Sequence, residues 1–427
     1  MTRHLFELTA TEAVEMINQK KIKAIDLVVD CLERISSLDK SIEAWTSLDP
    51  DAVIAAAKRA DEKPSTQPLT GIPIGLKDNI ETIDFPTTYG SAIYKGHLPA
   101  QDAVCVTLCK EAGTIIMGKT ASTEFAYRTP SSCKNPHNLA HSPGGSSSGS
   151  AAAVAAQMVP LAIGTQTAGS VIRPAAYCGV YALKPRYGDL SFAGVKNLAH
   201  SFDTLGCMAR SLEDLSLFYC ALQKTPNQKI DTSLIDAPNI AIYRTAFWDQ
   251  AQPAAVESFE KMLTTLSASK AQLHEVRLDS LDKEMLTASW TINKFEGSRY
   301  FLQDALTSPE LMSEAARALV QEGLEISFDH YQAARAVFER ARSLISLTLA
   351  EFDGVVSLSS PGEAPVGLQD TGPVTFNFIW TSTYLPALNI PFFKGPSGLP
   401  MGMQVVGTGT HHQLLEMGSW IEKQLQK

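Results

Sequence analysis

Apolar and polar positions follow two different periods along this chain. Residues 9–60 place apolar side chains three or four positions apart, as in the series Cys31, Leu32 and Ile35. This spacing puts them on one face of a helix. It predicts a helical N-terminal layer over residues 1–60.

Short β-like runs alternate with helical stretches from residue 69 to residue 215. The runs cover residues 71–76, 114–117 and 161–164, and the helical stretches cover residues 103–112 and 151–158. Alternation of this kind predicts an α/β sheet with helices on its faces. We expect residues 69–215 to form the core of the fold.

The second half of the chain has a different character. Residues 255–350 are mostly helical in pattern and more charged, which predicts a peripheral helical cap, with strand-like runs at 240–243 and 354–358 on either side of it. Residues 384–427 combine short apolar runs, split by prolines, with a last helix near Gln413, and we expect them to return to the core. With no internal repeat and no linker, the sequence predicts a single domain over residues 1–427.

Composition narrows the class of protein. The chain has 427 residues, of which 44% are hydrophobic, and its net charge is -9. The hydrophobic content excludes disorder as the main state, and the negative charge disfavours nucleic acid as a partner. The most apolar window, residues 151–164, is too short for a bilayer, so no membrane span is expected.

The N-terminus and the cysteines predict a cytoplasmic protein. The first residues lack the apolar core of a signal peptide. The seven cysteines are odd in number and scattered, as expected of reduced thiols in a core. The histidines show no metal-ligand spacing, so a zinc site is not expected.

Two motifs suggest chemistry that their surroundings do not support. Residues 113–120 fit the GxxxxGK[ST] phosphate-loop pattern, but a helix precedes Gly113 and the apolar spacer reads as a strand. Residues 145–149 fit the GxSxG nucleophile elbow with Ser147, but turn formers precede them where an elbow needs a strand. A Ser-His-Asp site using Ser147 with His330 or His411 remains the weaker alternative.

A third constellation offers one lysine and two serines. Lys77 directly follows the apolar run 72–76, and Ser146 and Ser170 lie in Gly-rich loops just before predicted helices. An amide carbonyl is a weak electrophile, so an attacking serine must lose its proton, and a lysine accepts one only when burial keeps it neutral. Asp78 would oppose this if it reached the site, but neighbours on a strand face opposite sides.

This constellation resembles the amidase signature family. The likeness spans nearly the whole chain and includes residues 144–150, 174–179, 183–185, 201–210 and 398–404. It implies a central mixed, twisted sheet flanked by helices on both faces. It also implies a Ser–cis-Ser–Lys triad without metal or cofactor, in which Ser170 is the nucleophile, Ser146 follows a cis peptide bond and Lys77 is the base.

By the same resemblance, the backbone N–H groups of four residues would form the oxyanion hole: Thr167, Ala168, Gly169 and Ser170. The more common family form has two glycines before the nucleophile, and Ala168 replaces the first. Alanine tolerates left-handed backbone angles poorly. Either Ala168 has ordinary angles or the loop is strained.

Arg173 is the residue that predicts which kind of substrate the site binds. It is the third residue after Ser170, where most family members carry an arginine at the second, and the segment resembles short malonamidase-type members whose arginine binds a substrate carboxylate. A guanidinium suits that task because its planar fork gives two hydrogen bonds. The alternative is a structural ion pair between Arg173 and an acidic residue of the cap.

The sequence therefore predicts an amidohydrolase that cleaves a small amide through a seryl acyl-enzyme. One hypothesis for the substrate is an amide that bears a carboxylate. The alternatives are a ureido-carboxylate of the allophanate type, an aryl or alkyl amide, and a carbamate. A different class is a glutamine-hydrolysing amidotransferase subunit, although the length without an added domain favours a free-standing hydrolase. Oligomeric state is left open, with a homodimer as one arrangement.

Overall fold

The computed structural model describes residues 3–62 and 67–426. Its strands are β1 (Trp45–Leu48), β2 (Pro73–Lys77), β3 (Ile115–Thr120), β4 (Leu161–Gln166), β5 (Tyr181–Lys184), β6 (Thr204–Ala209), β7 (Asn239–Tyr243), β8 (Gln272–Val276), β9 (Gly354–Leu358), β10 (Ala387–Lys394) and β11 (Pro400–Val406). Its α-helices are α1 (Ala10–Asn18), α2 (Ala24–Ile42), α3 (Pro50–Glu62), α4 (Val104–Glu111), α5 (Ser148–Ala155), α6 (Ile172–Cys178), α7 (Leu212–Gln223), α8 (Pro253–Ala268), α9 (Asp279–Tyr300), α10 (Leu302–Thr307), α11 (Glu314–Glu325), α12 (Phe328–Thr348), α13 (Phe378–Ser382) and α14 (His411–Leu425).

All the described strands join one sheet in the order β1-β3-β2-β4-β6-β5-β10-β11-β9-β7-β8. The sheet is mixed: β2 runs parallel to β3 and β4, β7 runs parallel to β8 and β9, and the other neighbours are antiparallel. The predicted α/β fold with a mixed sheet is confirmed.

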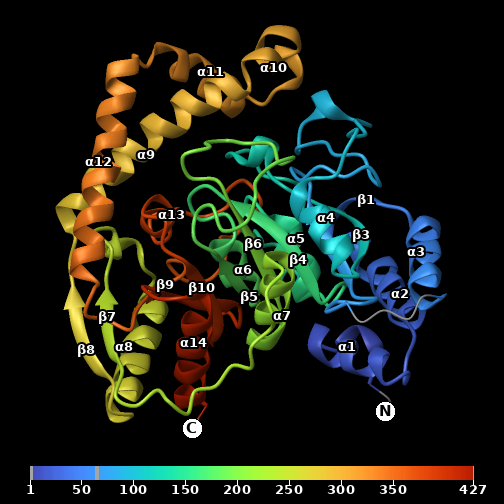
Figure 1. Cartoon of the computed structure of the whole chain (residues 1–427). Coiled ribbons are helices and arrows are strands. Elements are labelled where there is room, and N and C mark those ends of the chain that lie inside the picture. Colours follow the sequence, from blue (N-terminus) through green and yellow to red (C-terminus); the bar gives the residue numbers. More distant parts are fainter. Residues whose placement is uncertain (1–2, 63–66, 427) are drawn as a thin grey trace.

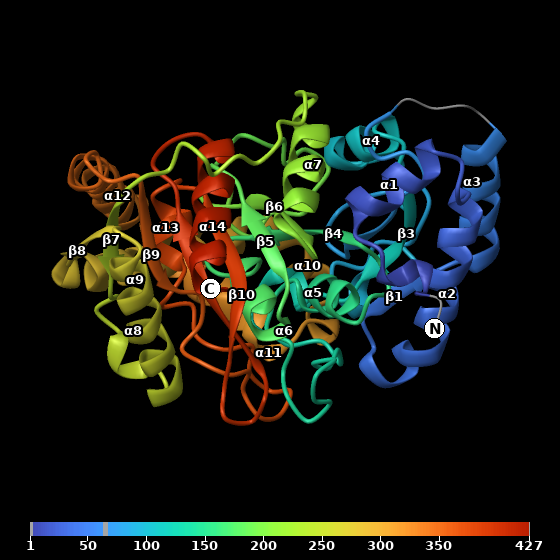
Figure 2. The same cartoon turned by 90° about the horizontal axis from the view of Figure 1, so that it is seen from below.

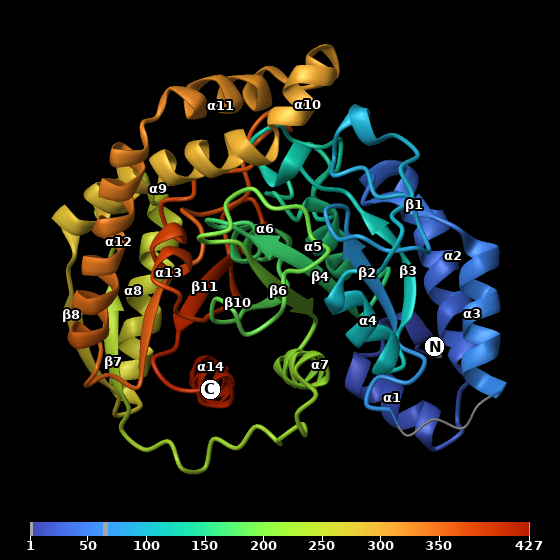
Figure 3. The same ribbon diagram turned by 45° about the horizontal axis from the view of Figure 1, so that its top comes forward.

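Helices cover both faces of the sheet, and this explains the unbroken apolar runs in its central strands. Every residue of β2, β3, β4 and β6 is buried. The helices α5 and α6 pack together over one face, and α7 and α14 pack together over the other (Figures 2 and 3). A strand covered on both faces has no solvated side and therefore shows no alternation.

The long helix α9 packs against α11 and α12, and these helices lie above the sheet in Figure 1. They lie within residues 255–350, for which the sequence predicts a helical cap, and are called the cap below. Helix α8 does not belong to it, because α8 packs on β8, β9 and α14 at the end of the sheet.

Two predicted helical regions each contain a strand. Residues 45–48 lie inside the N-terminal helical layer but form β1, which pairs with β3 at the edge of the sheet. Residues 272–276 lie inside the predicted cap but form β8 at the opposite edge. Both are short edge strands whose burial is partial, so the sequence shows little apolar alternation at either place.

The structure also bears on the predictions about the cysteines, membrane spans and domain organisation. The seven cysteines are unpaired, and all but Cys220 are buried, as expected of core thiols. In the described part of the chain, no helix is long and apolar enough to cross a membrane. One continuous sheet supports the single-domain organisation, which stays a prediction together with its regional boundaries.

Candidate active site

The candidate site lies at one end of the sheet, where two neighbouring central strands finish side by side. Strands β2 and β4 are parallel, with Leu76 opposite Ile163, so their carboxyl ends lie side by side. Lys77 is the last residue of β2. Strand β4 ends at Gln166 and continues through the loop of Thr167 to Ser170 into α6.

The second serine reaches this end of the sheet on the loop that precedes α5. The Gly145–Ser146 peptide bond is cis. Gly144 begins the loop with a φ of 79°, and a Cβ atom there would lie 2.9 Å from the Cα atom of Pro174 in α6. The loop therefore packs directly on the helix that follows Ser170, and glycine is needed both for the backbone angle and for the close approach.

Lys77 and Ser146 are in direct contact at this end of the sheet. The Nζ atom of Lys77 lies 2.6 Å from the Oγ atom of Ser146, and it also donates to the hydroxyl of Thr165 at 2.7 Å and to its carbonyl at 3.2 Å. Ser170 is 8% exposed and lines a cavity. The backbone N–H of Ser147 donates to the carbonyl of Ser170 at 3.2 Å, which ties the two serine loops together.

The environment of Lys77 favours its neutral form. The side chain is fully buried, and burial lowers the pKa of Lys77 well below its ordinary value. The nearby charge of Arg173 lowers this pKa further, whereas the charge of Asp203 raises it. No carboxylate in the described chain lies within ion-pair distance of Lys77, and Asp78 turns to the opposite side of β2, where it accepts a hydrogen bond from the N–H of Thr88.

Asp203 is a buried carboxyl group beside this site. It accepts hydrogen bonds from the hydroxyl of Thr167 at 2.5 Å and from the N–H groups of Leu198 and Ala199. Burial raises the pKa of Asp203 to about 7. Its charge, and hence its effect on Lys77, therefore changes near neutral pH.

Among the described residues, the loop before Ser170 has unpaired backbone N–H groups, and buried side-chain hydrogen bonds fix its conformation. No acceptor in the described chain pairs with the N–H groups of residues 167–170. The side chain of Gln166 accepts from two N–H groups at the start of α6 and donates to the hydroxyl of Thr381, which donates to the carbonyl of Ala168 at 2.8 Å. This fixes the peptide group that carries the Gly169 N–H. Such donors can stabilise a developing oxyanion.

The replacement of glycine by Ala168 does not place an alanine in the left-handed backbone region. The φ of Ala168 is not positive, so this residue avoids the left-handed region that alanine tolerates poorly. Gly169 is required for another reason, since a Cβ atom there would lie 2.6 Å from the Oδ1 atom of Asn377.

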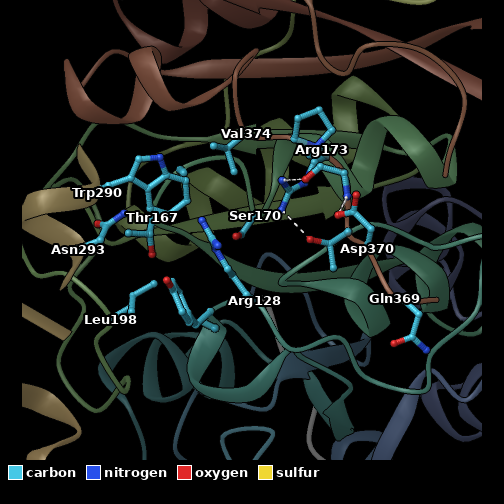
Figure 4. A pocket seen from close by; sticks show the side chains of 16 residues that line it. Arg128, Thr167, Ser170, Arg173, Leu198, Trp290, Asn293, Gln369, Asp370 and Val374 are labelled. Carbon is cyan, nitrogen blue, oxygen red and sulfur yellow. Dashed lines mark hydrogen bonds between the residues drawn. The ribbon is translucent and has the colours of Figure 1, made fainter. Parts of the chain in front are cut away.

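A cavity of about 330 Å³ opens above Ser170 (Figure 4). Its floor includes Thr167 and Ser170 from the sheet edge, and helix α9 of the cap contributes Trp290 and Asn293. The cavity thus lies where the core and the cap meet.

Arg173 lines the cavity and is held by backbone carbonyls. Its guanidinium donates to the carbonyls of Gly145, at 2.7 Å, and Gly372, and to the hydroxyl of Thr371 at 3.3 Å. It forms no ion pair with any residue that the structure describes, so the expected alternative, a salt bridge to an acidic residue of the cap, is wrong. Its Nε atom is buried without a partner.

The two competing motifs have structural roles. In the GxxxxGK[ST] segment, Lys119 is buried in β3, 3.6 Å from the carboxylate of Asp78, and donates to the hydroxyl of Thr87 at 2.7 Å. A Cβ atom on Gly118 would lie 2.2 Å from the carbonyl oxygen of Ser47 in β1. This glycine serves strand packing and does not cradle a phosphate.

The Ser147 elbow lacks its histidine. The Oγ atom of Ser147 pairs with the backbone N–H and carbonyl of Thr165, each at 3.2 Å. His411 pairs with Asp189 at 3.0 Å, and His330 lies exposed on α12. Neither contacts Ser147.

Several residues of the site carry no recognisable sequence signal. Arg128, Trp290, Asn293 and Asp370 line the cavity, and Thr381 supports its floor. They come from loops, from α9 and from α13, and they lie far apart in the sequence. The spacing of Trp290 and Asn293, which puts both on one helix face, was the only available hint.

Comparison with known proteins supports one family. A family model described as Amidase matches residues 26–415. The chain is 33% identical to a glutamyl-tRNA(Gln) amidotransferase subunit of Exiguobacterium sibiricum, over 94% of each chain. It is 27% identical to the peptide amidase of Stenotrophomonas maltophilia, with a TM-score of 0.84 and coverage of 98% and 97%.

A further structural neighbour belongs to a vestigial protein complex described as revealing the evolutionary origins of an s-triazine catabolic enzyme. That chain is 26% identical, with a TM-score of 0.88, and the match covers 97% of this chain and 98% of that one.

The different surroundings of the two buried lysines predict different effects on stability. Lys119→Met leaves the buried carboxylate of Asp78 without its cation, and should lower the free energy of unfolding by about 3 kcal/mol. Lys77→Met removes a buried amine that has no carboxylate partner, so relief of desolvation offsets lost hydrogen bonds and the change should stay within about 1 kcal/mol. Urea unfolding at pH 7 measures both, and equal losses would contradict this account of the site.

Proposed function

This chain belongs to the amidase family and is a hydrolase acting on C–N bonds, and we propose that Ser170, Ser146 and Lys77 are its catalytic triad. The observation that carries the proposal is the 2.6 Å contact between the buried amine of Lys77 and the hydroxyl of Ser146. Because no carboxylate pairs with Lys77 in the described chain, this amine can be neutral and accept a proton.

In the proposed mechanism, the Oγ atom of Ser170 attacks the amide carbonyl while its proton passes through the hydroxyl of Ser146 to the Nζ atom of Lys77. The carbonyl oxygen becomes an oxyanion, which accepts hydrogen bonds from N–H groups of residues 167–170. The intermediate collapses, and the C–N bond breaks as the proton returns through Ser146 to the leaving nitrogen. Water then attacks the acyl-enzyme by the same proton route and releases the acid.

The position of Arg173 favours a substrate that carries a carboxylate. Arg173 lines the cavity next to Ser170, and its charge has no carboxylate partner in the described chain. A buried cation without a counter-ion is costly, and a substrate carboxylate would relieve that cost. The resemblance of the segment around the nucleophile to malonamidase-type members stays a prediction of the sequence and points the same way. We therefore take malonamate-like acids ahead of ureido-carboxylates, aryl and alkyl amides and carbamates.

Glutamine is a second candidate substrate. The relative from Exiguobacterium sibiricum is an amidotransferase subunit, and Asp370 lines the cavity together with arginines. A carboxylate and a guanidinium could bind the α-amino and α-carboxylate groups of an amino acid. Ammonia release from glutamine, compared with release from malonamate, distinguishes the two substrates.

Two serine variants test the identity of the nucleophile. Ser170→Ala should lower kcat by at least about 1,000-fold with the fold intact, since the attacking oxygen is lost. Ser147→Ala removes only a hydroxyl that pairs with backbone, so it should keep activity within about tenfold. Ammonia release from an amide panel measures both, and the opposite ranking would replace the triad with the elbow.

The pH dependence tests the role of Lys77. Only the neutral amine acts as a base, so kcat/KM should rise with pH through an inflection below the roughly 10.4 of free lysine. Lys77→Arg should be inactive, because arginine stays protonated. Since the Asp203 carboxylate raises the pKa of Lys77, Asp203→Asn should move the inflection to lower pH. An active Lys77→Arg enzyme would contradict the role of Lys77 as base.

The substrate preference is tested with an isosteric pair, malonamate and malonamide. Arg173→Gln should lower kcat/KM on malonamate at least about tenfold more than on malonamide, through loss of a charge-assisted contact. Both rates should fall to some degree, because Arg173 also holds the Gly145 carbonyl. Thr371→Val is the control, since it removes one contact of the guanidinium and keeps its charge. An unchanged ratio for Arg173→Gln would withdraw the preference for acidic amides.

A further inference from the structure

A second arginine reaches the cavity from the opposite wall. Arg128 lines the same cavity as Arg173, and Figure 4 shows the two side chains on different sides of Ser170. Neither the proposed mechanism nor the resemblance to the family assigns a role to Arg128. Its guanidinium adds a charge to the cavity wall next to the cap.

The backbone that carries Arg128 is held in place. Phe125 and Ala126 have positive φ values of 51° and 58°, and Ala126, Tyr127 and Arg128 line the cavity. The carbonyl of Tyr127 accepts a hydrogen bond from the hydroxyl of Thr123 at 3.1 Å, and the carbonyl of Thr129 accepts one from the N–H of Glu124 at 3.1 Å. Arg128 therefore extends from a fixed point between two pinned peptide groups.

The guanidinium of Arg128 is oriented without being neutralised. It lies 4.5 Å from the ring centre of Trp290 on α9 and 5.6 Å from that of Tyr127. It forms no hydrogen bond and no ion pair with the described residues. Contact with an aromatic face leaves the N–H edge of a guanidinium free, and that edge binds a carboxylate through two hydrogen bonds.

The charge of the cavity is consistent with an anionic ligand. Two guanidiniums and one carboxylate, that of Asp370, line it, in a protein whose net charge is -9. Asp370 accepts the N–H of Gly372 and, among the described residues, forms no ion pair with either arginine. A local excess of positive charge in an acidic protein selects for negative ligands.

We propose that Arg128 is a specificity-determining residue that binds a second carboxylate, on the leaving-group side of the scissile amide. The inference rests on the proposed function. If Arg173 holds the acyl-side carboxylate and the carbonyl lies at Ser170, the leaving amine points away from Arg173, toward the wall formed by Arg128 and Trp290. The substrate class is then an amide with one carboxylate on each side of its C–N bond.

The test uses substrates that differ in one charge. N-malonylglycine carries the second carboxylate, and N-malonylglycinamide has the same shape with a neutral amide in its place. Arg128→Gln should lower kcat/KM on N-malonylglycine at least tenfold, and should change it on N-malonylglycinamide by less than twofold. Arg335→Gln is the matched control, because Arg335 is also exposed beside a tyrosine ring but lies outside this cavity. It should change neither rate.

A binding measurement separates this inference from the proposed mechanism. In the Ser170→Ala background, calorimetry should give a dissociation constant for N-malonylglycine that Arg128→Gln raises at least tenfold and that Arg128→Lys raises less. Equal losses on both substrates, or none, would overturn the role of Arg128 while amide hydrolysis persists. Failure of the proposed triad would instead show as full activity of the Ser170→Ala variant, with either arginine or glutamine at position 128.

Discussion

The amine of Lys77 is buried against two hydroxyl groups and a carbonyl, and none of its contacts in the described chain is a carboxylate. In this setting the charged form loses its hydration and gains no counter-ion, so the neutral form is favoured. Much of the architecture serves this arrangement. Two parallel strands place Lys77 beside Thr165, and helices on both faces of the sheet exclude water.

Lys119 shows how a buried lysine at the same end of the sheet behaves when a carboxylate is close to it. It is as deeply buried as Lys77 and lies on the neighbouring strand, but it faces Asp78. Burial lowers the pKa of Lys119 to about 8, and the charge of Asp78 opposes that shift. The alternation of side chains along β2 is what directs Asp78 to Lys119 and away from Lys77. One strand thereby separates a structural ion pair from a site suited to proton transfer.

The groups proposed for bond cleavage and those proposed for specificity come from different parts of the fold. Lys77, Ser146 and Ser170 lie on the sheet edge and on loops that begin helices, where the backbone is fixed by hydrogen bonds. The wall of the cavity combines these loops with α9 of the cap and with residues 369–374. A change in the cap can therefore alter which amide fits without moving the triad.

The sequence by itself determined the elements whose residues are close along the chain. The apolar runs of β2, β4 and β9 predict buried strands because helices on both faces leave them no polar side, and the Gly-rich loops with Lys77 predict the site through ordered motifs. Edge strands β1 and β8 escaped prediction because partial burial weakens their pattern. Only the tertiary structure decided that Arg173 binds backbone carbonyls and no acid of the described chain, and that Arg128 meets Trp290 above Ser170. Such contacts join residues far apart in sequence, and their geometry depends on how the layers pack, which no local pattern encodes.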